Sequence, residues 1–122
     1  MHKIWVADDD NAIRIVLEES LSSAGFDVKT FTSGDEVVTH LKNETPDLIL
    51  TDVQMPGMLG YDLLKHINDN HENIPVIIMT AFTDMQAAVD SYGGGAFEYI
   101  PKPFDLDEAI QIINRALDNK PT

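Results

Sequence analysis

The stretch Leu48-Ile49-Leu50-Thr51-Asp52 determines how the rest of this sequence is interpreted. A short β-prone run ends there on a carboxylate, with Pro46-Asp47 before it and Pro56-Gly57 after it. This pattern predicts a buried strand of a parallel sheet that is bounded by turns. The last residue would stand at the carboxyl end of that strand, where open α/β sheets place their ligand sites. Asp52 is therefore the first candidate functional residue.

Composition limits the class of protein. The chain has 122 residues, of which 43% are hydrophobic and 24% charged, and this predicts one globular domain. Asp and Glu number 21 against 8 Lys and Arg, which gives a net charge of −13. Nucleic acids and anionic membranes both need a basic face, so we expect direct contact with neither. The absence of cysteine excludes disulfides, thiolate catalysis and Cys-type zinc sites.

The amino-terminal apolar run, Ile4-Trp5-Val6-Ala7, is too short for a signal peptide or a membrane span. We therefore expect a cytoplasmic location. The ending Asn119-Lys120-Pro121-Thr122 is typical of the start of a linker, so residues 1–122 are expected to be the amino-terminal domain of a longer protein.

Five β-prone segments alternate with five predicted helices. The strands are expected at residues 3–7, 26–31, 48–52, 75–80 and 96–100. Apolar residues at helical spacing follow them over residues 13–24, 33–41, 61–67, 83–92 and 106–117. Strands joined by helical crossovers pair in parallel, with helices on both faces of the sheet. The predicted fold class is a doubly wound α/β fold with a five-stranded parallel sheet and Pro101-Lys102-Pro103 as the turn that leaves the last strand.

Polar residues gather where these strands end. The carboxyl ends of parallel strands share one edge of the sheet, which would bring together Asp8, Asp9, Asp10, Asp52, Thr80 and Lys102. Carboxylates held close together repel one another unless a cation lies between them, and oxygen ligands without His or Cys favour Mg²⁺. A lysine and a hydroxyl beside them would suit a tetrahedral anion. Together these residues predict a site that handles a phosphoryl group.

The whole chain resembles the receiver domains of two-component response regulators. The resemblance rests on the acidic cluster Asp8-Asp9-Asp10, on Asp52 in Leu-Thr-Asp-Val-Gln-Met-Pro-Gly, on Thr80 in Met-Thr-Ala, on Tyr99 and on Lys102-Pro103. Trp5 and the segments 75–82 and 95–104 are most similar to the nitrogen-regulatory NtrC type. No single motif is specific, but the five together, in this order and spacing, are.

The resemblance implies a mechanism and a role for each residue. Asp52 would take a phosphoryl group from a sensor histidine kinase, and Mg²⁺ would be held directly by Asp9, through water by Asp8, and by the backbone carbonyl of Gln54. Asp10 could replace one of this acidic pair or could simply cap the first helix. Lys102 would bind a phosphoryl oxygen, and in the family its bond to Pro103 is cis.

The family pattern also implies a switch. Thr80 would move to hydrogen-bond the phosphoryl group, and Tyr99 would turn inward into the space that it leaves. The surface formed by the fourth helix, the fifth strand and the fifth helix would change with them. The partners implied are the kinase and the protein's own ATPase and helix-turn-helix output domains, with dimerisation on phosphorylation as a further possibility.

This sequence departs from the family pattern at three places that affect the switch. Gln54 stands where Asn or Arg is frequent, Leu59 where an acidic residue is frequent, and Gly93-Gly94-Gly95 where one glycine is usual. Glycine costs about 1 kcal/mol per helical position relative to alanine. The hypothesis that follows is that the predicted helix over residues 84–92 frays or shifts easily at its end.

Each residue also has an ordinary structural explanation, and other functions share parts of the pattern. Aspartates at a helix start complement the helix dipole, and a lysine is usually solvated. A phosphatase of the haloacid-dehalogenase type needs a second aspartate where Gln54 stands. A flavodoxin-like flavin carrier shares the architecture, but three aspartates after the first strand would repel the phosphate of its flavin. A phosphorylation-independent module would have lost the acid pair or the lysine. We therefore expect a switch rather than an enzyme, and we interpret His2, His40, His66 and His71 as surface residues.

Overall fold

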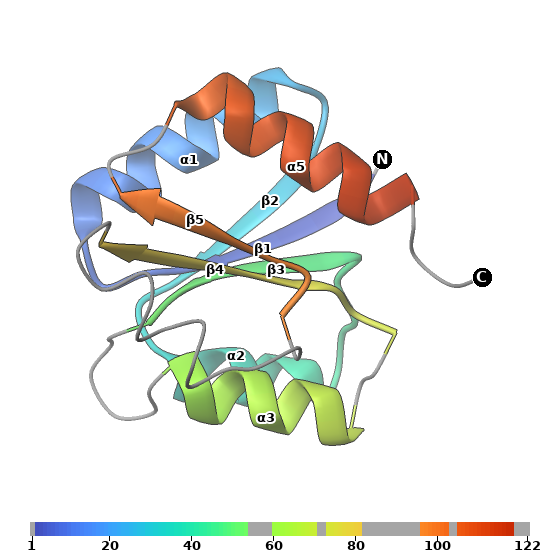
Figure 1. Ribbon diagram of the computed structural model, residues 1–122. Coiled ribbons are helices and arrows are strands. Elements are labelled where there is room, and N and C mark those ends of the chain that lie inside the picture. Colours follow the sequence, from blue (N-terminus) through green and yellow to red (C-terminus); the bar gives the residue numbers. More distant parts are fainter. Residues whose placement is uncertain (1, 54–59, 71–72, 82–95, 103–104, 119–122) are drawn as a thin grey trace.

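The computed structural model describes residues 2–53, 60–70, 73–81, 96–102 and 105–118. They form one sheet of five parallel strands in the order β2-β1-β3-β4-β5, which confirms the predicted fold class (Figure 1). The predicted helix over residues 83–92, together with Gln54, Leu59 and Pro103, lies outside the described residues. The strands are β1 (Lys3–Ala7), β2 (Asp27–Phe31), β3 (Leu48–Asp52), β4 (Val76–Ala81) and β5 (Glu98–Lys102).

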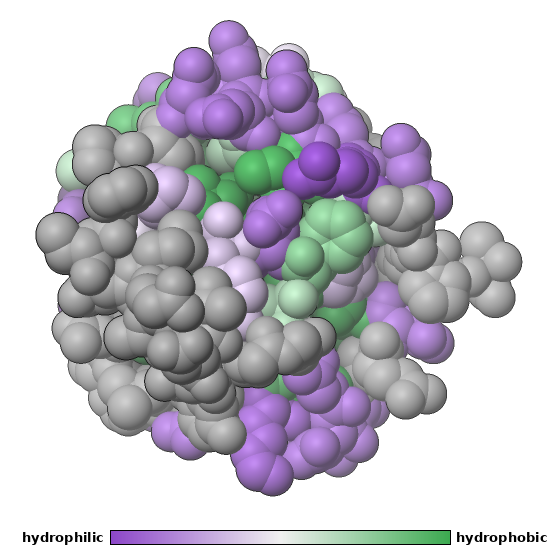
Figure 2. Space-filling model, in the orientation of Figure 1, coloured by the Kyte–Doolittle hydropathy of each residue, from purple (hydrophilic) through white to green (hydrophobic). Residues whose placement is uncertain are grey.

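Helices cover both faces of this sheet. The described helices are α1 (Asn11–Ser23), α2 (Gly34–Leu41), α3 (Gly60–Asn70) and α5 (Leu106–Asp118). Figure 1 shows α1 and α5 on one face and α2 and α3 on the other. In Figure 2 hydrophilic side chains lie over the outer sides of both helical layers, and hydrophobic side chains show between them. The apolar residues of the helices are therefore turned toward the sheet.

Each face of the sheet has its own core, because successive residues of a strand point to opposite sides. Toward α1 and α5, Ile4, Leu50, Ile77 and Met79 pack against Leu17, Leu21 and Ile113. Toward α2 and α3, Trp5, Ile49, Val76 and Ile78 pack against Val37, Leu63 and Ile67. Both residue sets are apolar, so β1, β3 and β4 read as continuous hydrophobic runs, as expected for parallel strands covered on both faces.

The register brings all five carboxyl ends to one edge. Ala7 pairs with Phe31 on one side and with Thr51 on the other, while Asp52 pairs with Met79. On β5, Pro101 pairs with Thr80 and Lys102 with Ala81. The residue that follows β1 and the last residues of β3, β4 and β5 are therefore neighbours, although up to 94 positions of sequence separate them.

The structure corrects the predicted end of the fifth strand. The sequence placed this strand at residues 96–100 and a turn at Pro101-Lys102-Pro103, but β5 runs from Glu98 to Lys102. Proline lacks a backbone N–H and is tolerated in edge strands, whose outer side needs no partner. β5 is the edge of this sheet, so pairing continues through Pro101 and carries Lys102 to the site.

Smaller differences occur at other boundaries. The helical pattern was expected over residues 61–67, but α3 runs from Gly60 to Asn70 and includes three polar residues at its end. Strand β2 begins at Asp27 rather than at Phe26, whose side chain is buried against the α1 layer. Among the described residues, no helix is both long enough and apolar enough to cross a membrane.

Candidate functional site

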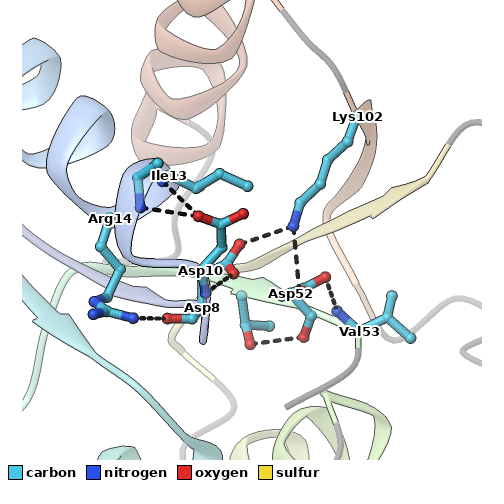
Figure 3. A network of polar contacts seen from close by, with 9 residues as sticks. Asp8, Asp10, Ile13, Arg14, Asp52, Val53 and Lys102 are labelled. Carbon is cyan, nitrogen blue, oxygen red and sulfur yellow. Dashed lines mark hydrogen bonds and ion pairs between the residues drawn. The ribbon is translucent and has the colours of Figure 1, made fainter.

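Asp8, immediately after β1, is the centre of the polar network at the carboxyl edge. Its side chain is fully buried. Its amide donates a hydrogen bond to the Phe31 carbonyl at 3.1 Å, and its own carbonyl accepts one from Arg14 Nη1 at 2.7 Å. Its Oδ1 accepts from the Asp10 amide at 2.8 Å, and its Oδ2 pairs with Lys102 Nζ at 2.8 Å (Figure 3). Both the backbone and the carboxylate of Asp8 are therefore held in place.

Asp10 has a different role from Asp8. It is the N-cap residue of α1, and its Oδ1 accepts hydrogen bonds from the amides of Ala12 at 2.9 Å and Ile13 at 3.3 Å. These amides belong to the first turn of the helix and have no partner within it. Of the two uses that the sequence left open for Asp10, the structure shows the cap.

Asp52 ends β3 with its side chain 15% exposed. Its Oδ1 accepts a hydrogen bond from the Val53 amide at 2.8 Å, and its Oδ2 lies 3.3 Å from Lys102 Nζ. Burial raises the pKa of this carboxyl, the negative charge of Asp8 raises it further, and the ammonium of Lys102 opposes both. Asp52 is thus accessible to a small reactant and carries a charge that the site only partly compensates.

Lys102 reaches from β5 to the carboxylates of both Asp8 and Asp52 (Figure 3). Burial by itself lowers the pKa of its ammonium, but the hydrogen bond to Asp8 and the charges of Asp52 and Asp8 outweigh that effect and raise it. Lys102 is therefore held in its charged form beside the candidate acceptor.

Three carboxylates in this network meet the requirement for a hard metal ion. One oxygen from each of Asp8, Asp9 and Asp52 lies within 4.8 Å of the other two. Oxygens bound to one octahedral Mg²⁺ are roughly 3–4 Å apart, because each bond is about 2.1 Å long. Asp9 is exposed while Asp8 is buried, so the group opens to solvent on one side. The donor set fits Mg²⁺.

Thr80 lies on β4, the strand next to Asp52, and Tyr99 lies on β5, one strand further from it. Thr80 is 3% exposed, and its hydroxyl makes no hydrogen bond to another described residue. Tyr99 is half-buried, packs against the core on the α2 and α3 side, and has its pKa raised by burial. The two residues therefore lie on adjacent strands, one at the carboxyl edge and one in the core below it.

Arg14 is a member of the network that the sequence patterns did not indicate. It contacts the main chain of Asp8 and the side chain of Asn11, and a backbone contact of this kind leaves no characteristic spacing. The only signal available was that Arg14 is the single cation among residues 8–19.

A strand-end aspartate, an acidic group suited to a metal ion and a lysine, all on one edge of a parallel sheet, define a phosphoacceptor class of protein. Residues 4–114 match the family of the response regulator receiver domain. The chain belongs to this family, and the resemblance seen in the sequence is confirmed.

Within the family, the likeness is to the NtrC type. The chain is 52% identical over 116 residues to the DNA-binding transcriptional regulator NtrC of Salmonella typhimurium and to that of Escherichia coli. The alignment covers 95% of this chain and 25% of each relative. The chain therefore spans about a quarter of the length of these curated relatives.

Solved structures agree with this placement. The solution structure of the apo receiver domain of Nitrogen Regulatory Protein C has a TM-score of 0.86 and 51% identity, covering 96% of this chain and 94% of that one. The Thermotoga maritima response regulator TrrA, solved in complex with Mg²⁺-BeF, has a TM-score of 0.85 and 28% identity, covering 95% of this chain and 99% of that one.

Proposed function

We propose that this domain is a phosphorylation switch in which Asp52 accepts a phosphoryl group from the phosphohistidine of a sensor histidine kinase. The observation that carries the proposal is the contact of Lys102 with both Asp8 and Asp52, at 2.8 and 3.3 Å, on the open edge of the sheet. Aspartates used only as helix caps would not need a lysine from another strand.

Mg²⁺ is the proposed cofactor. Asp8, Asp9 and Asp52 would hold it with their carboxylates, and the family pattern adds the backbone carbonyl of Gln54. The metal would supply positive charge that offsets the repulsion among the carboxylates and the charge on the phosphoryl oxygens. The Mg²⁺-BeF complex named for TrrA, which has the same fold, supports this choice.

The transfer step is a displacement at phosphorus. An oxygen of Asp52 forms a bond to phosphorus while the phosphorus–nitrogen bond of the phosphohistidine breaks, and the bonding electron pair stays on the imidazole nitrogen. The product is an acyl phosphate. Lys102 then moves its ammonium from the two carboxylates to a phosphoryl oxygen, which balances the charge that Asp52 has gained.

The switch would use Thr80 and Tyr99. The buried Thr80 hydroxyl, which has no partner among the described residues, is a suitable donor to a phosphoryl oxygen on the neighbouring strand. Tyr99 would follow toward the space that Thr80 leaves. Because Lys102 and Tyr99 both belong to β5, we expect the altered surface to comprise residues 83–92, β5 and α5.

The complete protein would act in the cytoplasm on transcription. NtrC relatives are about four times as long as this chain and are named as DNA-binding transcriptional regulators. We therefore expect ATPase and DNA-binding output domains beyond this receiver, a role in nitrogen assimilation, and dimerisation upon phosphorylation. With a net charge of −13 the receiver itself would not contact nucleic acid, and its chemistry would be limited to its own phosphorylation and dephosphorylation.

The test is the intact mass of the domain after incubation with Mg²⁺ and acetyl phosphate. We expect the wild type to gain one phosphoryl group, and Asp52→Asn or added EDTA to abolish the gain. Asp27→Asn is the matched control, because it removes an equal charge from an exposed residue at the opposite end of β2.

The gain of mass should be unchanged in Asp27→Asn. An unmodified wild type, under conditions that label another receiver, would contradict the proposal and would favour an interaction module that works without phosphorylation.

A further inference from the structure

Arg14 lies at the acidic site but belongs to none of the roles described above. Its Nη1 donates to the Asp8 carbonyl at 2.7 Å and its Nη2 to Asn11 Oδ1 at 2.8 Å, so one planar guanidinium joins the turn after β1 to the first turn of α1. The side chain is half-buried. In Figure 3 it reaches Asp8 from the side opposite Lys102.

Some contacts of Asp8 would be lost when Asp52 is phosphorylated, and others would persist. The contact with Lys102 is temporary under the proposed function, because the ammonium must move to the phosphoryl group. The contacts with the Phe31 carbonyl, the Asp10 amide and Arg14 do not involve reacting groups and can persist. Of these persistent contacts within the described part of the chain, only the one with Arg14 comes from the side chain of another residue.

We propose that Arg14 is a positioning residue for the metal site, which holds the backbone of Asp8 so that its carboxylate stays aimed at the cation when Lys102 leaves. This inference rests on the proposed binding of Mg²⁺ and extends it to a residue that does not touch the metal. Residues that orient metal ligands commonly change metal affinity by 10- to 100-fold.

The direction in which Mg²⁺ affinity changes when Arg14 is removed distinguishes a positioning role from a simple charge effect. Arg14 is a cation beside an anionic pocket, so through charge alone its removal would make the pocket more negative and Mg²⁺ binding tighter. If Arg14 positions Asp8, its removal loosens the backbone that carries the Asp8 carboxylate and makes Mg²⁺ binding weaker. A residue that only stabilised the fold would change the melting temperature without weakening the binding of Mg²⁺.

The test is a Mg²⁺ titration without any phosphodonor, followed by the backbone amide resonances of Asp10 and Val53. We expect Arg14→Gln to raise the dissociation constant for Mg²⁺ by about tenfold, the lower end of the usual range. Arg115→Gln is the matched control. It removes the chain's other arginine, whose ion pair with Glu98 is exposed and lies on α5 and β5, and it should leave the dissociation constant unchanged.

Arg14→Lys is the second variant. It keeps the charge but loses the planar pair of donors that reaches Asp8 and Asn11 together, so we expect it to bind Mg²⁺ more weakly than the wild type. Thermal melts establish that each variant is folded at the temperature of the titration.

The outcomes distinguish the inference from the function on which it rests. Unchanged or tighter binding by folded Arg14→Gln, or wild-type affinity of Arg14→Lys, would overturn the positioning role and leave the metal site intact. A wild type that does not bind Mg²⁺ would overturn the metal site itself.

Discussion

At the scale of residues, the site is a buried carboxylate that depends on one lysine. Asp8 is fully buried and Lys102 reaches it from β5, whereas the ion pairs of Lys3, Lys29, Lys65 and Arg115 are partly or largely exposed. A buried charge without its partner is costly, while an exposed pair contributes little. The lysine required for phosphoryl chemistry is therefore also a stabilising residue.

We expect Lys102→Met to lower the free energy of unfolding by about 3 kcal/mol, because it leaves the Asp8 carboxylate buried without its ammonium. Adding Asp8→Asn should restore much of this loss. Urea unfolding measures both changes. Lys65→Met is the control, since the exposed ion pair of Lys65 with Asp69 should contribute less than about 1 kcal/mol. Equal losses in the two lysine variants would contradict this account of the network.

The raised pKa of Asp52 makes the stability of the fold depend on pH. Burial and the charge of Asp8 raise the pKa of the folded state above its unfolded value. Protonation of Asp52 therefore favours folding, and this contribution is fully present below the unfolded pKa and lost as pH rises through the folded pKa. Ionised Asp52 is thus a cost at neutral pH when no metal is present.

Asp52→Asn removes that cost, so we expect it to melt at a higher temperature than the wild type at pH 7 in EDTA. The difference should narrow as pH falls through the folded pKa of Asp52. Thermal unfolding at a series of pH values checks this. A melting temperature for Asp52→Asn at or below that of the wild type at neutral pH would show that the compensation by Lys102 is complete.

At the scale of elements, the turn between β1 and α1 divides three adjacent aspartates among different tasks. Asp8 is buried in the ion pair with Lys102, Asp9 is the exposed member of the metal group, and Asp10 caps α1. Sequence alone left the use of Asp10 open because aspartate suits both a cap and a metal site. The backbone of the turn decides, since it places the Asp10 oxygen against the amides of Ala12 and Ile13.

Substitutions in this turn should separate stability from metal binding. Asp10→Ala removes the cap and should lower the free energy of unfolding by about 1 kcal/mol without weakening the binding of Mg²⁺. Asp9→Asn should weaken the binding of Mg²⁺ without lowering the free energy of unfolding, because Asp9 is exposed but belongs to the metal group. Urea unfolding and Mg²⁺ titration of both variants check this. Loss of Mg²⁺ binding in Asp10→Ala would return Asp10 to the set of ligands.

At the scale of the whole molecule, parallel order turns distant residues into neighbours. Asp8 and Lys102 are separated by 94 positions and meet because β1, β3, β4 and β5 all end at the same edge. This juxtaposition could be predicted from the sequence, since apolar runs alternating with helical patterns allow few topologies. β1 and β3 have their expected bounds.

Other features could not be predicted, for identifiable reasons. Pairing through Pro101 depends on β5 being an edge strand, which the residues of β5 do not show by themselves. The contact of Arg14 with the Asp8 carbonyl involves a backbone atom, so no pattern of side chains encodes it. The predicted fraying at the end of the helix over residues 84–92 stays a prediction, since those residues lie outside the described part of the chain.

The identity of the phosphorylated residue tests the central claim most directly. The domain is phosphorylated with acetyl phosphate and Mg²⁺, the acyl phosphate is reduced with borohydride to homoserine, and the modified position is located by peptide mass spectrometry. We predict homoserine at Asp52 and at no other position. Homoserine at Asp8, Asp9 or Asp10 with none at Asp52 would contradict the assignment of the acceptor to the end of β3.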